Sequence, residues 1–260
     1  MKKVFTISML FLFSAAVFGQ DAKGGDIKNF RFGVTTLPSI MWYKPDDLKK
    51  FESRGAAFRF GVLINAEYSF SGNFAMGFGI GLGSGGGKIN FLDSTHYFVK
   101  DDEIVEYPVP TDTVSQHFML STRTYKSSYY TIPISLKMRT GEIGYMRYFV
   151  EPRFNIGIKN KVRADDDVVV WGETTALKQE NLDITKDMAP IKMSVTISGG
   201  GEYYLSGSTA FVFAIGYDYG LSNVAHKTSD NLLRTKDGDT KVLEQKLAQN
   251  GLIISLGILF

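Results

Sequence analysis

The fold is decided by Leu252-Ile253-Ile254-Ser255-Leu256-Gly257-Ile258-Leu259-Phe260. Every second side chain in this stretch, from Leu252 to Phe260, is bulky and apolar. A strand that alternates in this way and ends on an aromatic residue would be an aggregation-prone edge in a soluble sheet. In a closed barrel that spans a membrane, the same apolar face would meet lipid. The stretch therefore predicts the last strand of a transmembrane barrel.

Seven further segments show the same alternation of apolar and polar or small residues over roughly ten positions, the length of a membrane-spanning strand. They are 30–36, 58–70, 74–83, 130–139, 147–158, 193–205 and 211–221. Together with the last segment they make eight strands, an even number. The predicted fold class is all-β, an eight-stranded antiparallel up-and-down outer-membrane β-barrel.

The connections between these segments alternate in length. Three are tight turns, around Gly72, Gly141 and Gly207, and four are long, at 41–56, 84–128, 159–190 and 222–250. Outer-membrane barrels have short turns on the periplasmic side and long loops on the outside. The alternation predicts a Gram-negative outer-membrane protein whose N- and C-termini are both periplasmic.

The N-terminal residues have the pattern of a secretory signal. Lys2 and Lys3 precede a mostly apolar stretch, Val4–Phe18, and Val17 and Gly19 are small enough for the −3 and −1 positions of a cleavage site. The apolar stretch is too short for a spanning helix. We expect a signal peptide over 1–19, a short periplasmic segment over 20–27 and the barrel over 28–260.

Composition excludes several classes of function. The sequence has no Cys, which excludes disulfides and a lipid-modified cysteine anchor. Removal of the signal takes two of the 29 basic residues, and the remaining 27 balance 27 acidic ones. Without a basic excess, nucleic-acid binding is not expected. The mean hydropathy of −0.05 fits a membrane barrel, because only alternate residues of its strands face lipid.

Charged side chains fall repeatedly on the predicted inward face. They are Arg31, Arg59, Glu67, Lys137, Arg139, Arg147, Glu151, Arg153, Lys192, Glu202 and Asp218. The interior of an eight-stranded barrel is just wide enough for side chains to fill it. We therefore favour an ion-paired plug that supports the wall, and the alternative is a weakly anion-preferring conduit. Aromatic residues near the predicted upper rim, including Trp42, Tyr43, Tyr129 and Tyr130, are expected to form an interfacial girdle.

Motifs for chemistry are weak. Gly81-Leu82-Gly83-Ser84-Gly85-Gly86 matches a dinucleotide-binding pattern, but the extended residues that follow offer no helix, so we interpret it as a flexible loop entry. His96, His117 and His226 fall on the predicted outer loops without the spacing of a metal site. No catalytic, cofactor or metal site is expected. A lipid-modifying enzyme would need a His and a Ser together on a lipid-facing strand.

Four segments of the predicted barrel are distinctive: Phe30–Val34, Tyr130–Lys137, Gly141–Tyr145 and Gly201–Tyr204. They resemble a Bacteroidota outer-membrane β-barrel family labelled PorT-like. The resemblance covers the strands over 28–260 and is weak over the outer loops. It implies a barrel and, through the family's namesake, an association with type IX secretion. Ile258 and Phe260 match the C-terminal insertion signal of such barrels, while Ser255 replaces its usual glycine.

The sequence thus favours a non-enzymatic binding or scaffold protein, associated with a secretion or surface-assembly complex. The alternatives are a small passive, porin-like channel and a lipid-modifying outer-membrane enzyme. Expected partners are outer-membrane lipid and lipopolysaccharide, the barrel-assembly machinery during insertion, and a protein bound through the long outer loops. The sequence does not define the roles of the loops 84–128 and 159–190.

Overall fold

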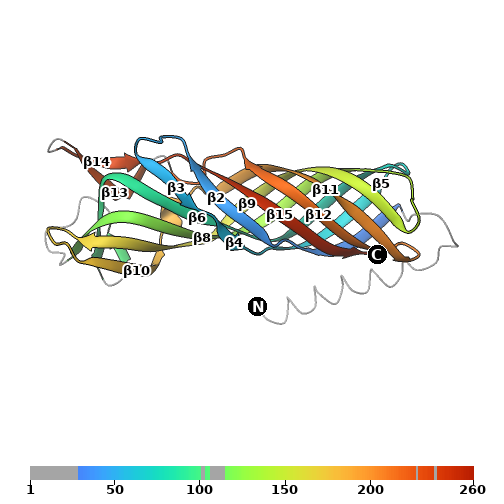
Figure 1. Ribbon diagram of the computed structural model, residues 1–260, viewed down its shortest axis with the longest axis horizontal. Helices are drawn as coiled ribbons and strands as arrows, with labels where there is room; N and C mark the ends of the chain where they lie inside the picture. The colour runs from blue at the N-terminus through green and yellow to red at the C-terminus, as the bar shows by residue number, and fades with distance from the viewer. Residues whose placement is uncertain (1–28, 101–102, 106–114, 227, 237–238) are drawn as a thin grey trace.

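The computed structural model describes residues 29–100, 103–105, 115–226, 228–236 and 239–260. In this part of the chain, eight strands form a closed antiparallel ring (Figure 1). In ring order they are β1 (Phe30–Thr36), β5 (Val62–Ser69), β6 (Phe74–Lys100), β8 (Gln116–Arg139), β9 (Met146–Val170), β11 (Ile191–Ser206), β12 (Thr209–Gly220) and β15 (Leu247–Leu259). The predicted fold class is confirmed. The expected signal peptide, 1–19, and periplasmic segment, 20–27, lie outside the described residues.

The first and last strands close the ring. β1 pairs with β15 from Gly33↔Leu259 to Thr36↔Leu256, and Phe32 and Phe260 exchange two backbone hydrogen bonds of 3.1 and 2.8 Å. The start of β1, the end of β15 and the three tight turns therefore share one end of the molecule. No helix in the described residues is long and apolar enough to cross a membrane.

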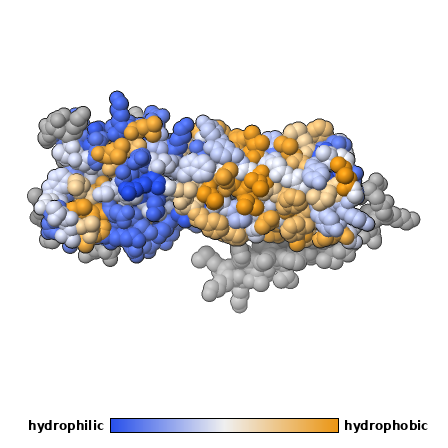
Figure 2. All heavy atoms as spheres, in the orientation of Figure 1, coloured by the Kyte–Doolittle hydropathy of each residue, from blue (hydrophilic) through white to orange (hydrophobic). Residues whose placement is uncertain are grey.

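An apolar belt surrounds the ring at this end, and Figure 2 shows it on one face of the molecule. On β12, for example, Phe211, Phe213, Ile215, Tyr217 and Tyr219 are all exposed, and the residues between them are buried. The belt is the outward face of eight segments. They are 30–40, 58–70, 74–82, 130–139, 146–158, 191–205, 209–221 and 252–260. Exposure of so much apolar surface is stable only against hydrocarbon.

Beyond the belt the strands continue into a second region, which we call the extension. β6 has 27 residues and β9 has 25, so β6 alone rises by about 70 Å at the strand tilt of such barrels. An apolar band is only about 25 Å tall. The long outer loops expected at 41–56, 84–128, 159–190 and 222–250 contain regular structure, since strands run through all four segments in the described residues.

Short elements attach to these long strands, in the extension and, for β2 and β4, at its boundary with the belt. They are β2 (Ser39–Pro45), β3 (Phe51–Gly55), β4 (Ala57–Arg59), β7 (Glu103–Val105), β10 (Ala176–Asp183), the 3₁₀ turn η1 (Thr185–Asp187), β13 (Thr228–Lys236) and β14 (Asp239–Glu244). β2 pairs with β15, β10 pairs with β9, and β3, β7 and β13 pair with β6. β13 and β14 form a hairpin at the end of the molecule opposite the tight turns (Figure 1).

The extension is held together by its own apolar core. Twenty buried side chains of the described residues form one cluster, among them Phe51, Ile89, Tyr97, Phe118 and Val168. On β6 the odd-numbered residues point inward throughout, yet the large apolar residues change sides. In the belt they are even-numbered and face outward, and in the extension Ile89, Phe91, Tyr97 and Val99 face inward. This change of side is the physical reason that the segments fold instead of remaining loops, since water replaces lipid as the outer solvent.

The glycine run of β6 lies at this boundary and is not a loop entry. Gly83, Gly85, Gly86 and Gly87 are part of the strand. A Cβ atom at Gly87 would lie 3.0 Å from the Cα atom of Trp42, so the run lets β2 approach β6 closely. The interpretation of 81–86 as a flexible loop entry is therefore wrong.

Two predicted girdle residues also lie elsewhere. Tyr43 and Tyr129 are 0% and 3% exposed and point into the lumen, whereas Tyr130 is 48% exposed on the belt. The hydroxyl groups of Tyr43 and Ser127 are 3.1 Å apart inside the barrel. The expected place of Tyr43 and Tyr129 in an interfacial girdle is wrong, because both stand at inward positions of the alternating strands β2 and β8.

Candidate functional site

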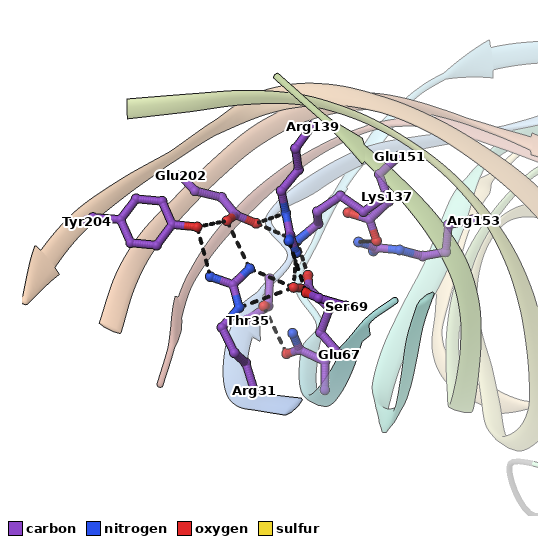
Figure 3. Close-up of polar contacts among 11 residues, drawn as sticks. Arg31, Thr35, Glu67, Ser69, Lys137, Arg139, Glu151, Arg153, Glu202 and Tyr204 are labelled. Atoms are coloured by element: carbon purple, nitrogen blue, oxygen red, sulfur yellow. Dashed lines mark hydrogen bonds and ion pairs between the residues drawn. The ribbon is translucent and has the colours of Figure 1, made fainter. Parts of the chain in front are cut away.

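The lumen near the tight turns contains a compact ion cluster (Figure 3). Arg31 from β1 donates to Glu67 of β5 at 2.6 Å and to Glu202 of β11 at 2.9 Å. Lys137 of β8 donates to the same two carboxylates at 2.6 and 3.0 Å. Arg139 bonds to both as well, at 3.3 Å from its Nε to Glu202. Three cations from β1 and β8 thus converge on two carboxylates from β5 and β11.

Neutral groups complete this ion cluster. The Tyr204 hydroxyl donates to Glu202 at 3.0 Å and accepts from Arg31 at 3.2 Å. Ser69 accepts a hydrogen bond of 3.2 Å from Arg139. All five charged members are at most 5% exposed. Sharing of each carboxylate among several donors offsets the desolvation that buried charges suffer.

The other predicted lumen charges form separate pairs. Arg153 donates to Glu151 at 3.1 Å, and Lys192 lies 3.5 Å from Asp218. Arg147 pairs at 3.3 Å with Glu142 in the turn and lies beside the Tyr204 ring. Arg59 bonds instead to the backbone carbonyls of Gly85 and Tyr125, at 2.9 and 2.7 Å. The eleven residues are therefore not one network. Five form the ion cluster, four form two pairs, Arg147 pairs with Glu142 outside the predicted set, and Arg59 is held by the strand backbone.

Two cavities lie above the ion cluster inside the barrel. One of about 60 Å³ is bordered by Tyr129, Arg153, Asn155, Lys192 and Asp218. A second of about 40 Å³ is bordered by Glu67, Lys137, Glu151 and Arg153. Each has room for a few water molecules. Arg153 lies between them and borders both.

The apolar core of the extension closes the lumen at the other end. Inside it lies an ion pair that the sequence analysis did not identify, Arg123 with Asp166, at 2.8 and 2.6 Å. The rings of Tyr97 and Tyr125 flank the guanidinium at 5.6 and 6.0 Å. Burial would lower the pKa of Arg123, but the adjacent Asp166 carboxylate outweighs burial and holds it above its ordinary value. The sequence could have indicated this pair only if β8 and β9 were expected to continue beyond the belt, where Arg123 and Asp166 take inward positions.

The histidines do not form a catalytic or metal-binding arrangement. His96 and His117 lie on β6 and β8, so their assignment to loops is wrong, but both are in the extension and far along the chain from the belt residues. His117 is stacked between Phe98 and Trp171, at 4.3 Å from each, and His96 meets His117 edge to face at 4.8 Å. In the described residues, no three His, Cys, Asp or Glu side chains are grouped so as to hold a metal ion.

The structure is a barrel with an outward apolar belt and a polar lumen, with three tight turns at one end and long connections at the other. A family model described as outer membrane protein beta-barrel domain matches residues 18–226. The chain belongs to this family. The family places the protein in the outer membrane, in agreement with the apolar belt.

Comparison with solved structures gives barrels of distant sequence. Neisserial surface protein A is 12% identical, with 90% of this chain and 98% of that chain covered and a TM-score of 0.43. The attachment invasion locus protein Ail of Yersinia pestis is 10% identical, with 88% and 98% covered and a TM-score of 0.36. The outer membrane protease OmpT of Escherichia coli is 7% identical, with 92% and 99% covered and a TM-score of 0.37. A search of curated protein sequences gave no match.

Proposed function

We propose that this protein is a non-enzymatic binding or scaffold component of the outer membrane, and that the extension is the surface that binds its partner. The observation that carries the proposal is that the extension has its own apolar core of twenty buried side chains among the described residues. A packed structure of this kind can hold a fixed surface for a partner at a distance from the membrane. The short turns and the paired chain ends at the other end support a periplasmic position for both termini.

The closed lumen supports a binding role over passive transport. The ion cluster of Arg31, Glu67, Lys137, Arg139 and Glu202 fills one end, and the apolar core of the extension fills the other. A porin-like channel is the second candidate, because the two cavities of about 60 and 40 Å³ lie between these closures. Single-channel recording in a planar bilayer separates the two. We expect no sustained openings, and regular openings would favour the channel.

A lipid-modifying enzyme is a weaker proposal. Its chemistry would require a His and a hydroxyl or carboxylate group on the lipid-facing belt. The described histidines, His96, His117 and His226, all lie outside the belt. The stacking of His117 between two aromatic rings, with His96 packed against it, also accounts for both residues without a catalytic role.

Association with secretion rests on the resemblance to PorT-like barrels and is part of the proposal. Outer-membrane lipid, lipopolysaccharide and the barrel-assembly machinery remain expected partners, with Ile258 and Phe260 as the insertion signal. Both of these residues are on the outward face of the barrel, 40% and 47% exposed. A photo-crosslinking amino acid at exposed Lys178 of the extension would test for a protein partner in native membranes.

The matched control for this experiment is the same amino acid at Met76, on the belt. We expect protein adducts from position 178 and lipid adducts from position 76. Adducts that contain secretion-machinery proteins would support the finer proposal. Absence of any protein adduct from the extension, together with channel openings, would overturn the binding role.

A further inference from the structure

The lumen contains more positive than negative side chains. Among the described residues whose charge lies inside the barrel below the Arg123–Asp166 pair, six are basic and four are acidic. The basic residues are Arg31, Arg59, Lys137, Arg139, Arg153 and Lys192, and the acidic ones are Glu67, Glu151, Glu202 and Asp218. Arg147 is not counted, because Glu142 neutralises it at the turn. Uncompensated charge in a closed, low-dielectric interior is costly.

Two of these cations have donors to spare, and both border the larger cavity. Lys192 has three N–H donors and makes one hydrogen bond within the described residues, the 3.5 Å contact with Asp218. Arg153 has five N–H donors and makes one hydrogen bond there, to Glu151 at 3.1 Å. Their side chains are only 12% and 11% exposed. The unused donors can therefore be satisfied only by what fills the cavity.

The carboxylate that borders this cavity, Asp218, already accepts hydrogen bonds from neighbouring side chains. Asp218 is 2% exposed, and its Oδ1 accepts hydrogen bonds from Thr196 at 2.8 Å and Asn155 at 3.4 Å. It is thus a weak partner for Lys192, as the 3.5 Å separation shows. The wall of the cavity adds neutral donors from Thr131, Ser194 and Tyr129. A cavity with spare cationic and hydroxyl donors and one engaged carboxylate is complementary to an anion.

From this arrangement we infer that the larger cavity is a binding site for a small inorganic anion of halide size, held between Lys192 and Arg153. The volume of about 60 Å³ admits one halide ion with water. The anion neutralises part of the positive excess and is a structural component of the lumen. The inference is independent of the proposed binding role of the extension.

The test is refolding of the purified protein into detergent micelles in sodium bromide or in sodium gluconate at equal ionic strength. Gluconate is a bulky organic anion of the same charge and serves as the comparison. We expect the thermal midpoint to rise by about 3 °C for each tenfold increase in bromide above its Kd, and not to respond to gluconate. Crystals grown in bromide should show an anomalous peak between Lys192 Nζ and the Arg153 guanidinium.

Two variants should change the bromide response in opposite directions. Asp218→Asn removes the competing carboxylate and keeps the size of the side chain, so bromide should bind more tightly and the response should begin at lower concentration. Lys192→Met with Asp218→Asn removes the cation without leaving a buried carboxylate unpaired, so the response should be lost. Lys88→Met, on the exposed outer face of β6, is the matched control and should behave as the wild type.

Three results would overturn the inference. One is a midpoint that responds equally to bromide and gluconate. Another is a bromide response that survives in the Lys192→Met, Asp218→Asn variant. The third is an adventitious ion only, which means an anomalous peak in the crystal without any bromide dependence of stability in solution.

Discussion

Arg123 and Asp166 lie directly opposite each other on β8 and β9 and are joined by two parallel hydrogen bonds inside the apolar core of the extension. Their side chains are 1% and 0% exposed. The pair lies close to the irregularity between Leu120 and Thr122, where the register of β8 against β9 shifts. A bidentate contact with fixed geometry at this point holds one register, because a slip of one residue would bury each charge alone.

Breaking this pair should unfold the extension and leave the barrel intact. Arg123→Met leaves the Asp166 carboxylate buried without its cation, and we expect a loss of about 3–5 kcal/mol in stability of the extension. Limited proteolysis under increasing urea measures it, with cleavage inside β8 or β9 as the readout. The double change Arg123→Met, Asp166→Leu should recover most of the loss. Lys126→Met, which removes a half-exposed partner of Asp165, is the control.

The ion cluster at the other end should govern the stability of the barrel itself. Glu202→Gln removes the charge that Arg31, Lys137 and Arg139 share, and leaves three buried cations around Glu67 alone. We expect a loss of about 3–5 kcal/mol, measured by urea unfolding in detergent micelles. Glu142→Gln, which removes the half-exposed partner of Arg147, should cost less than about 1 kcal/mol. Equal effects of the two changes would mean that the cluster does not support the wall.

The sequence could predict what depends on alternation within the belt. Arg31, Glu67 and Glu202 stand at polar positions between lipid-facing residues, so their inward direction followed from the period of two. The extension was missed because the same strands reverse their polarity outside the membrane. Ile89, Phe91, Tyr97 and Val99 keep a period of two, but their apolar face looks inward, and a search for apolar residues in the belt phase ends at Leu82.

Pairings across the lumen could not be predicted, since they depend on the register between strands. The sequence placed Arg59 and Arg147 among the lumen charges, yet Arg59 bonds to backbone carbonyls beside the glycine run and Arg147 turns toward Glu142. Neither contact could be inferred from the spacing of residues in the sequence. The same holds for Arg123 and Asp166, which are 43 residues apart.

The inward glycines of β6 should tolerate no side chain, because the neighbouring strands approach them closely. A Cβ atom at Gly79 would lie 2.9 Å from the carbonyl oxygen of Ile64 and 3.0 Å from the Pro133 ring. A Cβ atom at Gly81 would overlap the carbonyl oxygen of Val62. The limit is the approach of β5 and β8 to β6.

We therefore expect Gly81→Val to destabilise the barrel by about 2–3 kcal/mol, and Gly79→Val by a smaller amount, through overpacking. The measurement is the urea midpoint of unfolding in detergent micelles. Gly72→Val in the turn is the control, because nothing lies within 4 Å of a Cβ atom there. If Gly72→Val were as harmful as Gly81→Val, close packing of the wall would not be the cause.

The outer end of the extension should weaken at acid pH through His96. Its side chain is buried beside His117, and burial, with a smaller contribution from His117, lowers the pKa of His96 from 6.5 to about 4. Burial lowers the pKa of His117 as well. Between pH 6.5 and about 4 the unfolded chain binds more protons than the folded one, so stability falls as the pH falls. His96 alone contributes at most about 3 kcal/mol to the loss across this window.

Trp171 provides the readout for this pH dependence. It stacks on His117 at 4.3 Å and meets His96 at 4.9 Å, and the only other tryptophan of the chain is Trp42. In a Trp42→Phe background, the urea midpoint followed by Trp171 fluorescence should drop between pH 6.5 and 4. His96→Phe keeps an aromatic ring at this position and removes its proton site, so most of the drop should disappear. If the drop were unchanged in His96→Phe, the acid sensitivity would come from another group, and the burial of His96 would not be its cause.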